Sequence, residues 1–310
     1  NSVVDAGSYT NLELNVVGGI NKNVKWTVSD PTILNVYKGR VLGLKEGTAK
    51  VIATSVVDDN VYGELEITVN KVNKEEYSQE DIDYVNNIID KMTLSQKVGQ
   101  MFFVGFSGTS MPTSLNSAIE NYNFGNVIYM GANCTSPKTL VLMSNSIQNK
   151  MVSSNLVPAF ISTDQEGGRV ARLTSGGTHF VSQMALCATN DYNNAYFEGI
   201  AVAKELLSYG INMDFAPVLD VNNNPNNPII GIRSYAENPV SVALYGNNVI
   251  KGFKEVGLVG CPKHFPGHGN TSVDSHYGLP KITSTLEELY AIELAPFISA
   301  IENGVDSIMT

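Results

Sequence analysis

Three of the four histidines of this 310-residue chain lie in one segment, residues 263–276, which reads K-H-F-P-G-H-G-N-T-S-V-D-S-H. The segment begins with Lys263 and His264 and ends with Asp274 and His276 close together. Histidine changes charge near neutral pH, and a neighbouring carboxylate raises the basicity of the imidazole and fixes its tautomer. Such a side chain can give a proton to a leaving group and later take one from water. These residue types at this spacing therefore predict acid–base chemistry.

The segment is predicted to be a loop that follows a strand. An apolar run, residues 257–261, comes immediately before it. Pro266, Gly267 and Gly269 disfavour a helix through its middle. Loops carried on a rigid scaffold are the usual place for catalytic side chains, so we expect this loop to lie at the active site.

Metal binding is an alternative use of the same side chains. The possible ligands are His264, His268, Asp274 and His276. However, Phe-Pro-Gly separates His264 from His268, so the two cannot share a helix face as in an H-E-x-x-H motif. The three cysteines lie far apart without C-x-x-C spacing and are predicted to be buried free thiols. We therefore expect no metal and no cofactor.

Charged residues also follow earlier apolar runs, in D-Q-E-G-G-R-V starting at Asp164, F-A-P-V-L-D-V containing Asp220, and G-I-R-S-Y containing Arg233. The carboxyl ends of parallel barrel strands face one pocket. We therefore expect these three side chains to converge with Lys263 and His264.

Structural roles are predicted for four residues of these motifs. Asp220 is expected to brace its loop or to pair with an arginine, and Glu166 is expected to form an ion pair with Arg169. His268, which lies between two glycines, is expected to stabilise the loop. None of these roles requires a substrate.

Strand and helix patterns alternate from residue 93 onward. Candidate strands cover residues 101–106, 126–131, 158–163, 213–218, 258–263 and 306–310. Candidate helices cover residues 114–121, 136–153, 193–209, 240–256 and 285–303. Repeated strand–helix units predict an α/β fold, and because no G-x-G-x-x-G follows the first strand, a TIM-type barrel is favoured over a Rossmann sheet. About six of the eight strands that such a barrel needs are found, so the barrel is expected to be incomplete, with the remainder in a continuation of the chain or a separate fragment.

Residues 1–72 have a different pattern. Apolar and polar residues alternate in short runs such as 24–28 and 64–69, with turn signals between the runs. This pattern predicts a small all-β sandwich. Residues 73–92 are predicted to be a linker helix, and residues 93–310 to form the barrel domain.

The composition favours a globular protein, since 43% of the residues are hydrophobic and 16% are charged. The net charge of −10 argues against nucleic acid or an anionic membrane surface as a partner, because both attract basic proteins. No apolar run approaches the length of about 18 residues that spans a bilayer.

The motifs from residue 92 to residue 310 resemble glycoside hydrolase family 3, in particular its β-N-acetylglucosaminidase branch. D-Q-E-G-G-R-V, F-A-P-V-x-D-V, R-S-Y and K-H-F-P-G-H-G-x-T-x-x-D-S-H all occur in the order of that family. The resemblance implies a retaining exo-β-N-acetylglucosaminidase acting on peptidoglycan fragments, chitooligosaccharides or glycans. The alternatives are a β-glucosidase or glycoside phosphorylase of the same family, or a non-catalytic protein that binds cell wall or carbohydrate.

The resemblance also implies a role for each site residue. Asp274 and His276 would form the acid/base dyad of this branch. Asp164 would accept hydrogen bonds from sugar hydroxyls. The residues that would hold hydroxyls and the ring substituent are Arg233, Lys263 and His264. The carboxylate nucleophile that retaining chemistry requires is expected beyond residue 310, so residues 1–310 alone are predicted to be inactive.

The N-terminal region resembles the group 2 bacterial immunoglobulin-like domain. The resemblance rests on W-T-V-S-D-P starting at Trp26, followed by G-R-V-L-G and E-G-T-A-K-V. Such modules occur on extracellular and cell-wall proteins, so an extracellular or cell-wall-associated bacterial protein is expected. A spacer or docking role is favoured over binding of cell-wall polysaccharide, and Trp26 is expected in the sandwich core.

Overall fold

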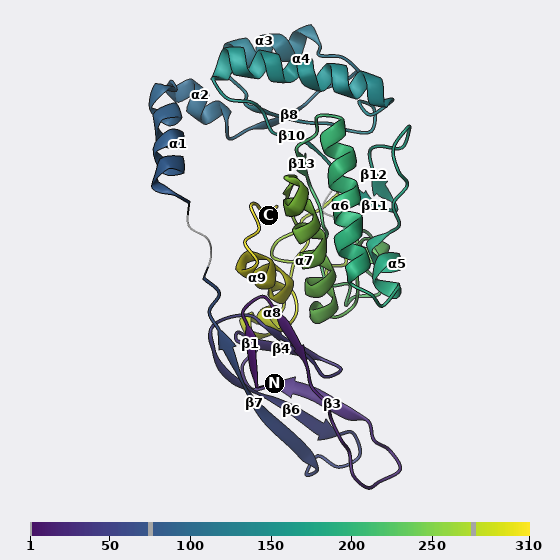
Figure 1. The fold of residues 1–310 in the computed structure, drawn as a ribbon. Coiled ribbons are helices and arrows are strands. Elements are labelled where there is room, and N and C mark those ends of the chain that lie inside the picture. The colour runs from purple at the N-terminus through teal and green to yellow at the C-terminus, as the bar shows by residue number, and fades with distance from the viewer. Residues whose placement is uncertain (1, 74–76, 274–276) are drawn as a thin grey trace.

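The computed structural model describes residues 2–73, 77–273 and 277–310, which form an N-terminal β unit and a larger α/β unit (Figure 1). Two of the predicted site residues, Asp274 and His276, lie outside the described residues. Among the helices that are described, none is long and apolar enough to cross a membrane.

The N-terminal unit consists of short strands in two sheets. The strands are β1 (Val3–Asp5), β2 (Tyr9–Asn11), β3 (Val24–Val28), β4 (Leu34–Tyr37), β5 (Arg40–Gly43), β6 (Gly47–Ser55) and β7 (Tyr62–Asn70). The strand orders are β1-β7-β6-β3 in one sheet and β2-β5-β4 in the other. Leu34 and Val41 of the second sheet pack against Val51 and Ile67 of the first, and Trp26 packs half-buried at the edge of this core. The all-β prediction for this region is confirmed, whereas its immunoglobulin-like assignment stays a prediction.

The helix predicted between the two units is present as α1 (Gln79–Lys91). It begins where the Ser78 side chain accepts a hydrogen bond from the backbone N–H of Asp81, which satisfies one of the free donors of the first turn. A second short helix, α2 (Leu94–Gly99), begins with a capping box formed by Thr93 and Gln96.

The larger unit contains a five-stranded parallel sheet in the order β14-β13-β10-β9-β8. These strands are β8 (Phe103–Gly105), β9 (Asn126–Ile128), β10 (Ile161–Thr163), β13 (Met213–Asp214) and β14 (Val259–Gly260). The intervening helices are α3 (Thr113–Tyr122), α4 (Pro137–Asn155), α5 (Gln183–Ala188), α6 (Asn193–Ser208) and α7 (Pro239–Val256). The parallel α/β prediction is confirmed, although each paired stretch is only two or three residues long.

Several features differ from the predicted elements, and helix α5 is one that was not predicted. A hairpin of β11 (Gln165–Gly167) and β12 (Val170–Ala171) follows β10, and a 3₁₀ turn covers Gly231–Arg233. The helix expected at residues 285–303 is divided into α8 (Leu286–Ala291) and α9 (Leu294–Glu302).

The strand predicted at residues 306–310 is not formed. Met309 accepts a backbone hydrogen bond from Phe265 and donates one to Pro262, at 2.8 and 3.0 Å. This segment therefore lies beside the strand end that follows β14, but two backbone bonds at one residue do not make a ladder.

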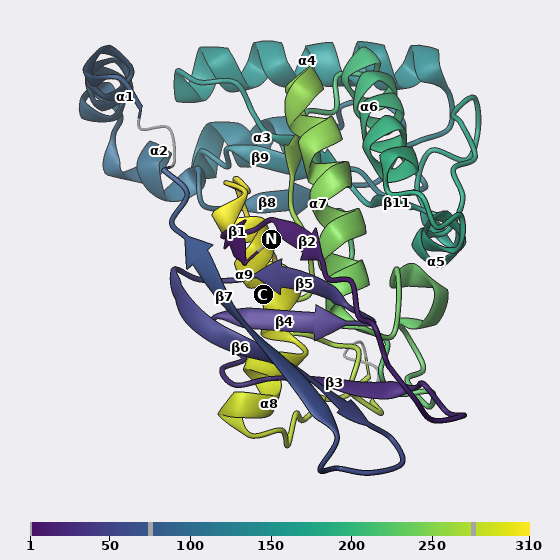
Figure 2. The same ribbon diagram turned by 60° about the horizontal axis from the view of Figure 1, so that its bottom comes forward.

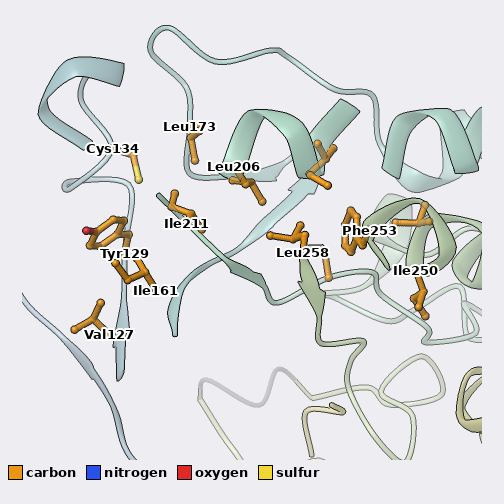
Figure 3. Packing of buried hydrophobic residues seen from close by; sticks show 14 of the residues in the cluster. Val127, Tyr129, Cys134, Ile161, Leu173, Leu206, Ile211, Ile250, Phe253 and Leu258 are labelled. Atoms are coloured by element: carbon orange, nitrogen blue, oxygen red, sulfur yellow. The ribbon is translucent and has the colours of Figure 1, made fainter. Parts of the chain in front are cut away.

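The sheet and its covering helices share one apolar core (Figure 3). Val127 and Ile161 come from adjacent strands, and Leu206 and Phe253 come from α6 and α7. Since parallel sheets must be covered on their faces, this core fixes the strand ends that carry the site. The described cysteines are all free thiols, as predicted, but the predicted burial holds only for Cys134 and Cys261, because Cys187 is half-buried.

The N-terminal unit packs on α7 and α9 of the larger unit (Figure 2). Leu42 and Leu44 from the β5 region form a buried cluster with Val240 and Ala243 of α7 and with Ala295 of α9. The two units are therefore joined by apolar contacts in addition to the covalent linker.

Candidate active site

Neighbouring parallel strands bring the predicted site residues to one edge of the sheet. Asp164 directly follows β10, and strands β10, β13 and β14 pair in parallel. A further parallel bridge joins Val218 to Lys263. Because the carboxyl ends of parallel strands lie at the same edge, Asp164, Asp220 and Lys263 come together although they are distant in the sequence.

Lys263 lies at the centre of the site. Its Nζ donates a hydrogen bond to Oδ1 of Asp164 at 2.7 Å and lies 2.7 Å from Oε1 of Glu166. The residue is only 2% exposed. A buried ammonium is strongly destabilising unless it is paired, and the two carboxylates supply that pairing.

The hairpin of β11 and β12 returns the chain over Asp164. Gly167 and Gly168 form its turn with φ of +85° and +58°, a backbone conformation that glycine adopts without strain. Arg172, just after the hairpin, donates from Nη2 to Oδ2 of Asp164 at 3.1 Å. Burial by itself raises the pKa of Asp164, but Lys263 and Arg172 outweigh burial and lower the pKa below its ordinary value. Asp164 is therefore held ionised between two cations.

Arg233 forms a bidentate ion pair with Glu166. The Nε–Oε2 and Nη2–Oε1 distances are both 2.8 Å. Burial lowers the pKa of Arg233, but the contact with Glu166, helped by Asp220 and Asp164, raises it overall. The predicted pair of Glu166 with Arg169 is wrong, because Glu166 is buried against Arg233 while Arg169 is exposed.

His264 is oriented by Asp220. Its Nδ1 lies 2.6 Å from Oδ2 of Asp220, and its Nε2 lies 3.4 Å from Nη2 of Arg233. A carboxylate only accepts hydrogen bonds and a guanidinium only donates them. A neutral imidazole with its proton on Nδ1 satisfies both neighbours and leaves Nε2 as an acceptor.

Asp220 also braces the loop beyond His264. Its Oδ1 accepts the backbone N–H of His268 at 2.6 Å. The His268 Nδ1 lies 2.6 Å from the Thr271 hydroxyl, and Asn227 Nδ2 donates to the His268 carbonyl at 2.7 Å. The structural roles predicted for Asp220 and His268 are confirmed.

The interior of the site holds paired charges of both signs, and its surface is polar. The side chains of Asp164, Arg172 and His264 are 14, 33 and 26% exposed, whereas that of Lys263 is 3% exposed. These partly exposed side chains can accept hydrogen bonds from polar ligands or donate to them. The buried Lys263 holds Asp164 in position through its ion pair. Nowhere in the described part of the chain do three or more His, Cys, Asp or Glu residues form a group that could hold a metal ion.

The structure brings four predicted site residues together: Asp164, Arg233, Lys263 and His264. Arg172 was not singled out, although D-Q-E-G-G-R-V-A-R contains its signal. Gly-Gly between short polar and apolar runs indicates a hairpin, which returns residue 172 beside residue 164. Asp214, which accepts the backbone N–H of Gln165 at 2.9 Å beneath the site, was also missed.

The sequence profile of the glycosyl hydrolase family 3 N-terminal domain matches residues 93–310. Beta-hexosaminidase A of Pseudoalteromonas piscicida is 37% identical over 232 residues, which are 68% of this chain and 39% of that protein. The beta-hexosaminidase of Thiobacillus denitrificans is 33% identical over 209 residues, which are 66% of this chain and 57% of that protein.

Solved structures give the same assignment. A glycoside hydrolase family 3 beta-N-acetylglucosaminidase from Paenibacillus sp. is 43% identical, with a TM-score of 0.69 over 71% of this chain and 42% of that one. NagZ from Neisseria gonorrhoeae, in complex with N-trifluoroacetyl-D-glucosamine, is 29% identical, with a TM-score of 0.62 over 67% of this chain and 62% of that one. The chain thus spans between 39 and 62% of the length of these four proteins.

Proposed function

The chain belongs to glycosyl hydrolase family 3, and from this premise we propose that the whole protein is a retaining exo-β-N-acetylglucosaminidase. It releases terminal N-acetylglucosamine from peptidoglycan fragments, chitooligosaccharides or glycans, and needs no cofactor. The similarity to two bacterial beta-hexosaminidases and to a beta-N-acetylglucosaminidase supports this substrate class.

The observation that carries the proposal is the doubly paired carboxylate of Asp164. Lys263 and Arg172 keep it ionised at the edge of the site, where it is partly exposed. An ionised carboxylate accepts short, strong hydrogen bonds from two neighbouring hydroxyls. A terminal sugar presents such a pair of hydroxyls, and Asp164 can receive them at the edge of the site.

Proton transfer in this proposal belongs to Asp274 and His276. The carboxylate raises the basicity of the imidazole, which protonates the glycosidic oxygen and then activates water. A retaining reaction also needs a carboxylate nucleophile on the opposite face of the sugar. We assign that role to an aspartate outside residues 1–310 and to none of the described carboxylates.

Hydrolysis of a 4-nitrophenyl β-N-acetylglucosaminide by the whole protein tests the activity. We expect His276→Ala to lower kcat by about 10²- to 10⁴-fold, the usual contribution of a general acid–base group, whereas the exposed His179→Ala should match the wild type. Faster hydrolysis of the glucoside than of the N-acetylglucosaminide would overturn the substrate class.

The product distinguishes the mechanisms. NMR during the first turnovers should show the β-anomer, as expected for retention. Formation of N-acetylglucosamine 1-phosphate in phosphate buffer would instead identify a glycoside phosphorylase. Formation of the α-anomer from water would exclude a retaining enzyme.

We further propose that the β unit is an immunoglobulin-like module and that the protein is extracellular or associated with the bacterial cell wall. Two sheets that share one core support the module assignment. Sedimentation with insoluble peptidoglycan tests wall association: equal sedimentation of the whole protein and of a variant without residues 1–72 would refute binding through the β unit.

A further inference from the structure

Gln165 is a buried amide to which the proposed reaction assigns no role. It directly follows Asp164 in the sequence and is only 2% exposed. Its backbone N–H donates to Oδ1 of Asp214 at 2.9 Å. A buried amide is costly unless it is hydrogen-bonded, so the bonds that the side chain makes are informative.

The side-chain carbonyl of Gln165 receives two successive backbone donors from the far end of the hairpin. Its Oε1 accepts the N–H of Arg172 at 2.9 Å and the N–H of Leu173 at 3.1 Å. Both partners are donors, so they determine which end of the amide faces them. The other end, Nε2, makes no hydrogen bond among the described residues. The amide therefore holds the hairpin through its oxygen alone.

These two bonds continue the hairpin beyond its last strand pair. β11 and β12 pair only at Gln165 with Ala171 and at Gly167 with Val170, with an irregular register between the two pairs. A hairpin this short is marginally stable by itself. Since β12 ends at Ala171, the Gln165 side chain stands in for a strand partner at the next two residues. It therefore determines where the backbone of Arg172 lies.

The place of Arg172 matters because its side chain completes the pairing of Asp164. Nη2 of Arg172 donates to Oδ2 of Asp164 at 3.1 Å, while Lys263 occupies Oδ1 at 2.7 Å. Lys263 is fixed to the sheet by its parallel bridge to Val218. Arg172 has no such strand partner, and its side chain is 33% exposed. Of the two cations, Arg172 is thus the one whose position depends on a side-chain contact.

We propose that Gln165 is a positioning residue of the sugar-binding site: its Oε1 holds the backbone of Arg172 and Leu173 and so sets the guanidinium against Asp164. This inference rests on the proposed function for its meaning in catalysis. A carboxylate held by two fixed cations is already oriented when the sugar arrives, which lowers the entropy lost on binding. Without Oε1, two backbone N–H groups lack an acceptor, which favours a hairpin that moves away from Asp164.

Gln165→Met tests the proposal in the whole protein, because it keeps an unbranched side chain and removes the acceptor. We expect KM for 4-nitrophenyl β-N-acetylglucosaminide to rise by about fivefold to tenfold with kcat within about twofold, the pattern of lost binding that ground state and transition state share. Gln79→Met, at an exposed position of α1, is the matched control and should leave both constants unchanged. An unchanged KM in Gln165→Met would overturn the proposal.

Gln165→Glu is the conservative variant that should restore binding. A carboxyl group keeps an acceptor oxygen for the two N–H groups in either protonation state. The exchange gives up no hydrogen bond among the described residues, because Nε2 makes none. We expect a KM within about threefold of the wild type, since the shared binding term is retained. A KM as high as that of Gln165→Met would show that the acceptor is not what matters.

A double-mutant cycle with Arg172→Ala separates positioning from a general effect on the fold. If Gln165 acts through Arg172, then Gln165→Met adds little once the guanidinium is absent, and the coupling in kcat/KM is about fivefold or more. Fully additive losses of kcat/KM would contradict a role exerted through Arg172.

Backbone hydrogen exchange provides a readout that is independent of activity. In the wild type, the N–H groups of Arg172 and Leu173 should exchange about tenfold or more slowly than that of the exposed Ser175. The exchange should become fast in Gln165→Met and stay slow in Gln165→Glu. Fast exchange at both positions in the wild type would refute the contact, even if Gln165→Met does not fold. Slow exchange that responds to the variants, in a protein that hydrolyses no glycoside, would support positioning and reject the proposed function.

Discussion

At the scale of single residues, the site is a set of buried charges that neutralise one another. Lys263 is 2% exposed and contacts the carboxylates of Asp164 and Glu166, each at 2.7 Å. Glu166 in turn binds Arg233 through both oxygens. Removing one member of such a set leaves an unpaired charge in the protein interior. The resulting loss of folding free energy is larger than the net stabilisation that the ion pair provides.

Lys263→Met should therefore lower the free energy of unfolding by about 3–5 kcal/mol. The methionine fills a similar volume but leaves Glu166 with Arg233 alone and Asp164 with Arg172 alone. Urea unfolding of the whole protein measures the loss. Lys281→Met, at an exposed position, is the control, and equal stabilities of the two variants would contradict the role assigned to Lys263.

Asp214 makes stability depend on pH. It is completely buried, and burial raises its pKa from the ordinary 3.8 to about 7. Between these values the folded state keeps a proton that the unfolded state has lost. Stability therefore falls as pH rises from about 4 to about 7, by on the order of a few kcal/mol, and then levels off.

Asp214→Asn removes this titration and keeps an acceptor for the Gln165 N–H. We expect the variant to be more stable than the wild type above about pH 7, and the difference to vanish near pH 4. Asp164, whose pKa is lowered, titrates in both proteins, so subtracting the two curves isolates Asp214. Parallel curves of unfolding free energy against pH would show that Asp214 does not titrate in this range.

At the scale of elements, the regular spacing of apolar residues predicted most helices and strands of the α/β unit. It did not predict the short irregular elements. The parallel strands were found because apolar runs alternate with helical patterns. The division between α8 and α9 has a local cause at Pro296. Proline has no N–H to donate to the carbonyl of residue 292 and clashes with it in a continuous helix. Because α9 starts at Leu294, Pro296 lies in its first turn, where no intrahelical donor is required.

The contacts of the site depended on elements too short for periodicity to reveal. Arg172 reaches Asp164 because of a hairpin with strands of three and two residues. The burial of Lys263 likewise follows from the way the loops pack over the strand ends. Motif positions thus located the site, whereas the choice of partner for Glu166 required three-dimensional distances.

Gly269 tests how closely the site loops must approach. A Cβ atom at this position would lie 1.7 Å from the carbonyl oxygen of Val221, so Gly269→Ala forces the two loops apart. We expect a loss of stability of about 2 kcal/mol or more, as for other overpacking changes, together with a higher KM. Gly131→Ala has open space around it and should be nearly neutral. Similar urea midpoints for both variants would show that the loops separate without cost.

At the scale of the whole molecule, the β unit is part of the support of the site. Besides the apolar cluster with α7 and α9, Asn35 of β4 donates to the carbonyl of Ala291 at 2.6 Å. Ala291 ends α8, two residues before Glu293, and a Cβ atom on Gly267 would be 2.8 Å from Cβ of Glu293. The β unit therefore braces the helix junction that contacts the K-H-F-P-G-H-G bend, so we expect the two units to unfold together.

Leu44→Asp tests this coupling. Leu44 is fully buried against α7 and α9, and an unpaired charge there costs several kcal/mol unless the surfaces separate. Calorimetry of the wild type should show the two units melting in one transition, and the variant should show two, because each unit has its own apolar core. Leu14→Asp, at a position of the β unit that is 43% exposed, should keep the single transition. Separate transitions in the wild type would mean that the contact between the units is too weak to couple their folding, and the β unit would then be a spacer without influence on the site.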